Sequence, residues 1–331
     1  MNAERTGGAH AEAGIRDSLQ ENVARMDGGR VDSGAGRADS SAARMDGGRL
    51  DSGAGRAESG GSRVDGGRLA TGAAGDGPSK ARIDDDAVRV LRTAIDRVVN
   101  TQREPIAAVA DLIADAIPAG GIVQVFGTGH SRAFAMEIAG RAGGLVPANM
   151  LAVKDLVFRG GEDPAAILDP LVERDPALAA RILALHDLHP RDVFLVVSSS
   201  GGNGSTVEMA RLAKERGHPV VAVTSLEHSR GITSRHPSGL RLFEVADVVI
   251  DNCSAYGDAE LAISGASLTI CPTSSVTGAV IAQMITTQVC ARLLAAGHEV
   301  PVYVSANVPE GDAHNERMEA RYGTRVTHSE P

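Results

Sequence analysis

Two segments of the chain combine glycines with hydroxyl side chains, a mixture that suits the binding of an anion. The first is Gly-Thr-Gly-His-Ser-Arg at 127–132, and the second is Ser-Ser-Ser-Gly-Gly-Asn-Gly-Ser-Thr at 198–206. Glycines let backbone amides approach an anion closely, and hydroxyl and N–H donors at a helix start favour a phosphate monoester. The second segment contains no lysine, so neutral donors would hold the anion. Either segment alone is equally consistent with a turn and an N-cap, but two of them favour a binding site.

The first segment does not fit the patterns of the common nucleotide sites. A dinucleotide fingerprint needs a third glycine where Arg132 stands, and no acidic ribose ligand follows at the expected distance. The Gly-Lys-Ser/Thr of a nucleotide P-loop does not occur in the sequence. We therefore expect neither a dinucleotide cofactor nor a nucleoside triphosphate.

Strands and helices must position both segments. Apolar runs predict strands at 122–126, 193–197, 220–224 and 245–250. Helical spacing begins at Val88 and predicts further helices at 105–117, 132–142, 176–187, 205–216 and 274–296. Strands that alternate with helices are typical of a parallel sheet covered on both faces, in which ligands bind where strands end. The sequence therefore predicts one α/β domain with both glycine segments at one edge of its sheet.

Composition excludes several classes of partner. The 331 residues carry 33 Lys and Arg against 42 Asp and Glu, a net charge of −9, and only 2% are aromatic. A nucleic-acid binder would show a basic surface or stacking aromatics.

The first thirty residues lack an apolar signal region, and the three cysteines form no disulfide framework, so we expect a cytoplasmic protein. The uncharged run over 261–291 is interrupted by Pro272 and predicts a buried or interface helix rather than a membrane span.

The first eighty residues differ in character from the rest. A motif of the type Arg-Met-Asp-Gly-Gly-Arg starts at Arg25, Arg44 and Arg63, with a spacing of 19 residues. Each repeat contains too few apolar residues to offset the entropy of ordering the chain. We therefore expect a disordered tail over 1–80 and a folded domain over 81–331. A tethering or partner-binding role for the tail is the alternative to no chemistry at all.

The order of the motifs resembles that of a known family. A strand, Gly-Thr-Gly-x-Ser and a helix, followed by a strand, Ser-x-Ser-Gly and a helix, resemble the SIS (sugar isomerase) domain over about 85–325. Its members include phosphoheptose isomerase, the isomerase half of glucosamine-6-phosphate synthase and N-acetylmuramic acid 6-phosphate etherase. The chain is similar in particular to a branch of predicted phosphosugar-binding proteins. That similarity rests on segments at 141–145, 224–229, 234–239, 257–259 and 307–312.

The resemblance implies a flavodoxin-like, three-layer αβα sandwich that is usually dimeric and binds sugar phosphates at the carboxyl ends of its strands. Matching positions imply that Ser131, Ser198 and Ser200 hold the phosphate. Asn203 stands where the family has Ser or Thr, and its amide can still donate a hydrogen bond. The complete set of phosphosugar-binding candidates is Gly127, Thr128, Gly129, Ser131, Ser198, Ser199, Ser200, Gly201, Asn203, Ser205 and Thr206.

Isomerisation of an aldose to a ketose needs a base that moves a proton between adjacent carbons. Glu137, six residues after Ser131, is a candidate base, and its alternative role is that of an ion-paired helix residue. His130, inside the first segment, could orient the ligand or act as an acid. His228 and His236 flank the loop after the third predicted strand. By the resemblance, a partner subunit completes the site, and His314 is a candidate for that role.

We expect no metal, because the sequence has no HxH, HExxH or CxxC spacing and the helix after 127–132 lacks the histidine that phosphoheptose isomerases use for zinc. Cys253 is expected to be a small buried residue rather than a reactive thiol. The sequence therefore predicts a protein that binds a phosphorylated amino or N-acylated sugar and isomerises it. The alternatives are a lyase, etherase or deaminase on the same fold, and a non-catalytic sugar-phosphate sensor acting through protein partners. A hydrolase is disfavoured because no G-x-S-x-G elbow is present.

Overall fold

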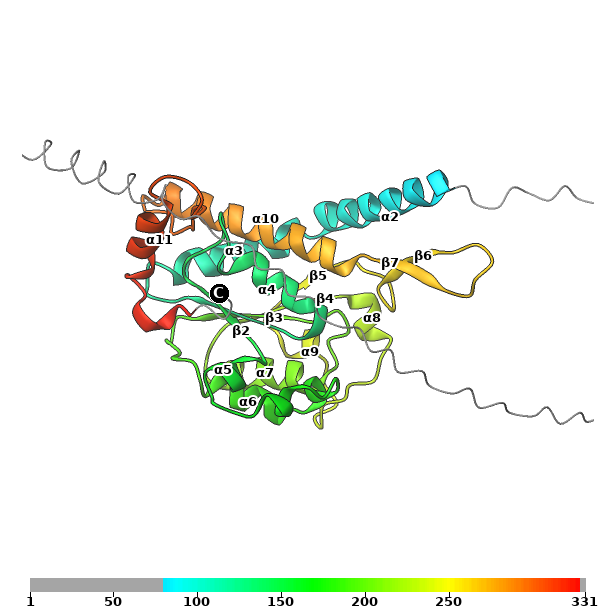
Figure 1. Ribbon diagram of the computed structural model, residues 1–331, viewed down its shortest axis with the longest axis horizontal. Coiled ribbons are helices and arrows are strands. Elements are labelled where there is room, and N and C mark those ends of the chain that lie inside the picture. Colours follow the sequence, from blue (N-terminus) through cyan, green and yellow to red (C-terminus); the bar gives the residue numbers. More distant parts are fainter. Residues whose placement is uncertain (1–79, 328–331) are drawn as a thin grey trace, which may run out of the picture. The chain divides into compact units, whose positions relative to one another are not determined.

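A computed structural model describes the backbone of residues 80–327 and the side chains of residues 83–327. The tail expected over 1–80 lies, apart from Lys80, outside the described residues. The described chain forms a five-stranded parallel sheet in the order β2-β1-β3-β4-β5, together with a separate two-stranded antiparallel sheet. Helices cover both faces of the large sheet (Figure 1). This arrangement confirms the predicted α/β sandwich.

The strands of the large sheet are β1 (Val123–Gly127), β2 (Ala148–Leu151), β3 (Val193–Val197), β4 (Val220–Thr224) and β5 (Val248–Asp251). The small sheet pairs β6 (Ala259–Ala262) with β7 (Thr269–Pro272). The helices are α2 (Lys80–Thr101), α3 (Arg103–Ala116), α4 (Arg132–Ile138), α5 (Asp155–Phe158), α6 (Ala177–Leu183), α7 (Gly204–Glu215), α8 (Leu226–Arg230), α9 (Leu242–Val245), α10 (Ser274–Ala295) and α11 (Gly311–Glu319).

Alternation along the strands builds two cores. In β3, the side chains of Val193, Leu195 and Val197 join a core with α3, α4 and α10 on one face of the sheet. Phe194 and Val196 point to the other face and pack with α5, α6, α7 and α9. Because successive strand side chains face opposite sides, a strand buried on both faces is mostly apolar. The continuous apolar run of β3 has this cause.

Three predicted boundaries were wrong. The helix predicted at 132–142 ends at Ile138, because the chain turns extended at Ala139 and then reaches Gly140 with φ +74°. The helix predicted at 176–187 ends at Leu183. The strand predicted at 245–250 begins only at Val248, because 242–245 forms the short helix α9. Local apolar content does not distinguish such a buried helical turn from a strand.

Three strands (β2, β6 and β7) and several short helices were missed altogether by sequence reasoning, and β2 shows why. Asn149 interrupts its apolar pattern, but its side chain is satisfied by the C-terminal segment. Its Nδ2 donates to the carbonyl oxygen of Arg325 at 2.6 Å, and its Oδ1 accepts from the amide of Thr327 at 2.8 Å. A partner more than 170 residues away makes a polar residue acceptable in a buried strand.

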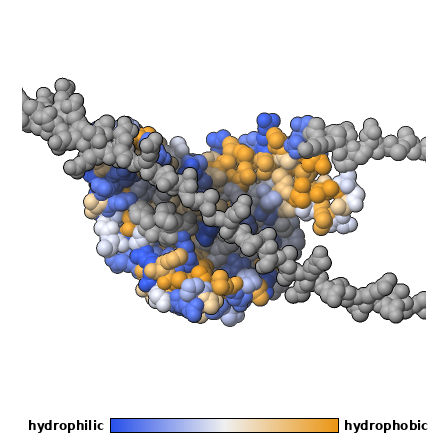
Figure 2. All heavy atoms as spheres, viewed as in Figure 1, coloured by the Kyte–Doolittle hydropathy of each residue, from blue (hydrophilic) through white to orange (hydrophobic). Residues whose placement is uncertain are grey.

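The long helix α10, whose charged residue is Arg292 in its last turn, packs against α3 and α4 in the domain. Within residues 80–327 it is the one helix that is long and apolar enough to cross a membrane, by length and composition only. Its buried positions include Ile281, Ile285 and Val289, which belong to the core on that face of the sheet. This packing agrees with the predicted buried helix. Figure 2 shows further apolar residues gathered at the end of the domain where α2, β6 and β7 lie.

Candidate functional site

Two loops leave neighbouring strands at the carboxyl edge of the sheet. Loop 1 (127–132) follows β1, and loop 2 (198–206) follows β3, with Gly127 directly opposite Val197 in the parallel register. Loop 1 leads to α4 on one face of the sheet, whereas loop 2 leads to α7 on the other. Loops that diverge in this way open the crevice in which open α/β sheets bind ligands. The structure therefore brings together the two segments singled out in the sequence.

A small cavity of about 20 Å³ lies where the two loops converge. Loop 1 contributes His130 and Ser131, loop 2 contributes Ser199, and the start of α10 contributes Ser274 and Ser275. Asn252, which follows β5, completes the polar lining and donates from Nδ2 to the Ser199 hydroxyl oxygen at 3.0 Å. Polar residues of four separate segments therefore meet at this point.

A second cavity, of about 470 Å³, lies beside loop 1. Gly127, Thr128 and Gly129 form one wall, and the others come from the end of β2 (152–154) and from the segment 167–173. Its lining mixes apolar side chains with charged ones, among them Arg132 and Glu173. A space of this size and mixed character can hold a small polar molecule.

Buried hydroxyls fix the backbone of loop 2. The Ser198 Oγ accepts from the amide of Gly201 at 3.1 Å, and the Ser229 Oγ donates to the carbonyl oxygen of Ser200 at 2.8 Å. Ser229 also pairs with the Thr224 hydroxyl at 2.7 Å, and both of these side chains are fully buried. Because buried polar groups are costly to leave unpaired, this network holds the loop in one shape. Loop 2 is therefore preorganised before any ligand binds.

The first turn of α7 lacks a side-chain cap. Asn203 occupies the N-cap position in an extended conformation, but its side chain makes no capping hydrogen bond. The first amides of a helix have no partner within the helix. In addition, the Thr206 hydroxyl is fully buried and has no partner among the described residues. An anion seated here would satisfy N–H groups that the protein leaves unpaired.

A carboxylate missed by sequence reasoning lies over both loops. The Glu173 Oε1 accepts from the Asn203 Nδ2 at 2.8 Å. The backbone carbonyl oxygen of Glu173 accepts from the Ser205 Oγ at 2.7 Å. A methyl group built on Gly129 would lie 3.8 Å from the Glu173 Oε2. Glu173 therefore contacts loop 2 while its second oxygen faces loop 1.

The segment that carries Glu173 has one signal in the sequence. Three Asp-Pro pairs, beginning at Asp163, Asp169 and Asp175, punctuate it, and each aspartate accepts from the amide two residues later at 2.8–2.9 Å. Such turns indicate an ordered loop, but they do not reveal where the loop lies. Only the tertiary structure places it against loop 2.

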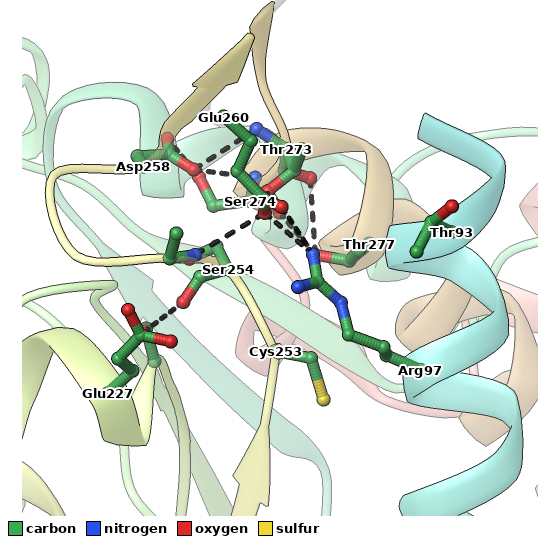
Figure 3. Close-up of polar contacts among 12 residues, drawn as sticks. Thr93, Arg97, Glu227, Cys253, Ser254, Asp258, Glu260, Thr273, Ser274 and Thr277 are labelled. Atoms are coloured by element: carbon green, nitrogen blue, oxygen red, sulfur yellow. Dashed lines mark hydrogen bonds and ion pairs between the residues drawn. The ribbon is translucent and has the colours of Figure 1, made fainter. Parts of the chain in front are cut away.

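Figure 3 shows the polar cluster that fixes the start of α10 beside the small cavity. The carboxylate of Asp258 accepts from the amide of Ser274 at 2.8 Å and from its hydroxyl at 2.7 Å. Glu260 accepts from the Thr273 hydroxyl at 2.8 Å and from the Arg97 guanidinium at 2.6 and 2.7 Å. These contacts join α2, β6 and α10 into one support for Ser274 and Ser275. The cluster therefore has a structural role in the site.

The pH dependence of folding should report on this cluster. Burial raises the pKa of Glu260, but hydrogen bonds from Arg97 and Thr273 outweigh it, so the pKa lies below its ordinary value. The stabilisation is present above the unfolded-state pKa of about 4.3 and is lost as the pH falls through the lower folded-state pKa. We expect Glu260→Gln to cost about 1–2 kcal/mol at pH 7, a difference that shrinks as the pH falls through the folded-state pKa of Glu260.

Urea denaturation between pH 3 and pH 7 measures this difference. The matched control is Glu299→Gln, which breaks an exposed ion pair with Arg321 and should cost less than about 0.5 kcal/mol. A cost for Glu260→Gln that stays constant over this pH range would contradict an ionic role for Glu260.

The other predicted catalytic residues lie outside both cavities. On α4, the Glu137 carboxylate pairs with Arg141 and accepts from the Gln283 Nε2 of α10 at 2.9 Å. His314 on α11 bonds through Nε2 to the carbonyl oxygen of Val302 at 2.9 Å. Of the three predicted catalytic residues, His130 lines the small cavity, whereas Glu137 and His314 line neither cavity.

His228 and His236, which follow β4, have different surroundings. The His228 ring packs on Tyr256 with 4.9 Å between ring centroids. His236 is buried and bonds to the Glu208 carboxylate of α7 at 2.8 Å. Both are held by neighbouring side chains, and neither lines the small cavity or the cavity beside loop 1.

Over residues 83–327, no group of three histidine, cysteine, aspartate or glutamate side chains could hold a metal ion. Cys253 is half-buried, and its Sγ lies 3.7 Å from the Thr101 hydroxyl. Burial raises the pKa of the Cys253 thiol, which keeps it protonated and weakly nucleophilic.

The strand order and the paired glycine loops define an α/β protein of the SIS type. The family model of the SIS domain matches residues 88–225 of the chain. A UPF0309 protein of Geobacillus kaustophilus is 38% identical over 232 residues, which cover 70% of this chain and 91% of that protein. A UPF0309 protein of Listeria monocytogenes is 35% identical over 242 residues, covering 73% and 95%. The chain belongs to the UPF0309 family.

Solved structures with a similar fold include two phosphoheptose isomerases. The enzyme of Francisella tularensis is 16% identical, with a TM-score of 0.44, and the match covers 64% of this chain and 98% of that one. The enzyme of Neisseria gonorrhoeae is 18% identical, with a TM-score of 0.41, and the match covers 64% and 96%.

Proposed function

We propose that this protein binds a phosphorylated sugar in the crevice between loop 1 and loop 2. The observation that carries the proposal is that two hydroxyl-rich glycine loops leave neighbouring strands at one edge of the sheet, and that one of them opens the uncapped helix α7. Unpaired amides and the positive end of a helix stabilise a phosphate. The phosphate would therefore lie on loop 2, with Ser198, Ser200 and the α7 amides as donors, and the sugar would extend towards loop 1.

The cavity beside loop 1 supports an amino or N-acylated sugar. Its wall contains Val153, Ile167 and Val172, against which an acyl group could pack, and Glu173 and Asp169, which could accept from an amide or ammonium. A site that pairs apolar surface with a few placed polar groups discriminates between substituents of similar size. The substituent at the second carbon would thus decide which sugar phosphate binds best.

The proposed reaction is isomerisation between aldose and ketose. Within one chain, Glu173 takes the base role first considered for Glu137, because it is the carboxylate that faces both loops. Glu173 removes the proton from the second carbon of the open-chain sugar and returns it to the first carbon. His130 would assist ring opening and the transfer between the two oxygens. A homodimer, and a role for His314 from its second subunit, stay predictions of the resemblance.

Two other outcomes share the same site. β-Elimination begins with removal of the same proton, so a lyase would use Glu173 in its first step. A sensor would bind the sugar phosphate and leave it unchanged. The experiment that separates them must therefore measure binding and turnover on the same ligand.

Thermal unfolding of the full chain with glucosamine 6-phosphate, N-acetylglucosamine 6-phosphate, fructose 6-phosphate and the unphosphorylated parents tests the proposal. A ligand at about 100 times its Kd should add about 2.7 kcal/mol of stability. We expect stabilisation only by phosphorylated sugars, and its loss in Ser200→Ala. NMR of each bound ligand in D₂O then reports isomerisation, elimination or no reaction. Equal stabilisation by parents and phosphates, or none at all, would overturn the phosphate site.

A further inference from the structure

The segment between α8 and α9 (231–241) lies directly on loop 2. The amide of Arg235 donates to the carbonyl oxygen of Gly202 at 2.8 Å, and the amide of Leu242 donates to that of Gly201 at 2.8 Å. A methyl group built on Gly202 would lie only 2.5 Å from the Ile232 side chain. The absence of a side chain at Gly202 therefore allows this segment to approach the backbone of loop 2.

A buried contact fixes the position of the segment. His236, 5% exposed, bonds through Nε2 to the Glu208 carboxylate of α7 at 2.8 Å and through Nδ1 to the Ser238 hydroxyl at 2.7 Å. Since α7 begins at loop 2, this contact ties residue 236 to the helix that loop 2 opens. The neighbouring Arg235 is thereby held beside loop 2 by both its backbone and its sequence neighbour.

A hydrogen bond holds the Arg235 guanidinium, but no ion pair balances its charge. Its Nη1 donates to the Asn203 Oδ1 at 3.1 Å, and no carboxylate of residues 83–327 lies within ion-pair distance of it. Arg241, six residues later, is by contrast paired with Glu244 at 2.9 Å. A guanidinium has five N–H donors, so most of those of Arg235 remain available to a ligand.

Asn203 connects two opposite charges across the start of α7. Its Oδ1 accepts from Arg235, and its Nδ2 donates to Glu173 at 2.8 Å. The side chain is therefore turned sideways and leaves the first amides of the helix uncapped. A serine or threonine, which the SIS pattern has at this position, carries one hydroxyl oxygen and could not span both partners in this way.

We propose that Arg235 is a phosphate-recognition residue of the crevice, positioned by Asn203. The inference rests on the proposed binding of a sugar phosphate and names the cation for that site. Every residue of loop 2 from 198 to 206 is neutral, so Arg235, which bonds to Asn203 and to the Gly202 carbonyl oxygen, brings a positive charge to this loop. Its planar guanidinium can give two parallel hydrogen bonds to phosphate oxygens. Asn203 acts as a positioning residue.

Binding of inorganic phosphate to the full chain, measured by isothermal titration calorimetry at constant ionic strength, tests the inference. We expect Arg235→Gln to weaken binding by about 10- to 100-fold. Arg235→Lys should restore part of the loss, because it keeps the charge without the planar geometry. Asn203→Ala should weaken binding less, and the ratio of affinities for a sugar phosphate and its parent should fall in all three variants. A merely structural role would not change this ratio.

The matched control is Arg230→Gln. Arg230 is an exposed arginine of α8 whose guanidinium lies 6.0 Å from the Phe243 ring centroid, and its loss removes the same charge from the same region. Phosphate binding unchanged in Arg235→Gln but lost in Ser200→Ala would overturn the role of Arg235 and leave the proposed function standing. Failure of the wild-type chain to bind phosphate, or equal binding by every variant, would overturn both.

Discussion

Replacing Glu173 with glutamine is expected to lower kcat by about 10²- to 10⁴-fold, the usual contribution of a positioned acid–base group. The substitution removes the proton acceptor, whereas the glutamine oxygen can still accept from the Asn203 Nδ2 that now bonds to Oε1. KM should therefore change little. Exchange of the proton on the second carbon with D₂O, followed by NMR, should slow by the same factor in the variant.

Glu162→Gln is the control for this experiment. Glu162 lies in the same region of the chain and pairs with Arg181 rather than with either loop. Its loss should leave kcat within about threefold of the wild type, because it is not expected to contact the reacting atoms. A kcat for Glu173→Gln that also stays within threefold would assign the base to another residue and return attention to Glu137.

The second large effect is expected from Gly204→Ala. An alanine methyl group at this first residue of α7 would lie 2.2 Å from the carbonyl oxygen of Arg174 and 2.9 Å from the Pro176 ring. The segment that carries Glu173 would therefore have to move away from loop 2. Displacement of a catalytic group by about 1 Å can cost 10²-fold in rate, and we expect a fall in kcat of that order. Overpacking should also cost about 1–3 kcal/mol of stability.

Gly278→Ala provides the comparison for stability. It also adds a methyl group to a buried glycine of a helix, but the nearest atom outside the helix backbone would be 3.6 Å away on Phe134. This variant should keep its stability or gain up to about 1 kcal/mol, because alanine favours the helix. Urea denaturation measures both variants. Equal stabilities for the two would show that the contact between Arg174 and α7 is not tight in solution.

Parts of the fold that depend on neighbouring residues were predictable. The runs that form β3 and β4 are continuous and apolar, the run that forms β1 is apolar apart from Gln124, and each is followed by a polar turn. Their loops could be identified as sites because glycines and hydroxyls cluster there. The short helix α9 was not predictable, because Leu242 and Val245 are buried in a single turn that resembles the start of a strand.

The site was only partly predictable for a related reason. Loops 1 and 2 were identified from their own residues, but Glu173 and Arg235 belong to segments 30 and 32 residues from Asn203. Nothing in the local sequence indicates that a carboxylate and a guanidinium meet the same amide side chain. Such contacts depend on the order of strands and the course of long loops, which local pattern does not specify.

By itself, the sequence determined that this protein has a parallel sheet with two hydroxyl-rich glycine loops at one edge, because apolar runs and glycine punctuation act over a few residues. The tertiary structure alone decided which charges accompany those loops. In the folded chain the Glu137 carboxylate pairs with Arg141 and Gln283, and it is the Glu173 carboxylate that contacts loop 2. It also placed Arg235 beside a loop that has no charge of its own. Packing between distant segments creates these neighbours, so they exist only once the chain has folded.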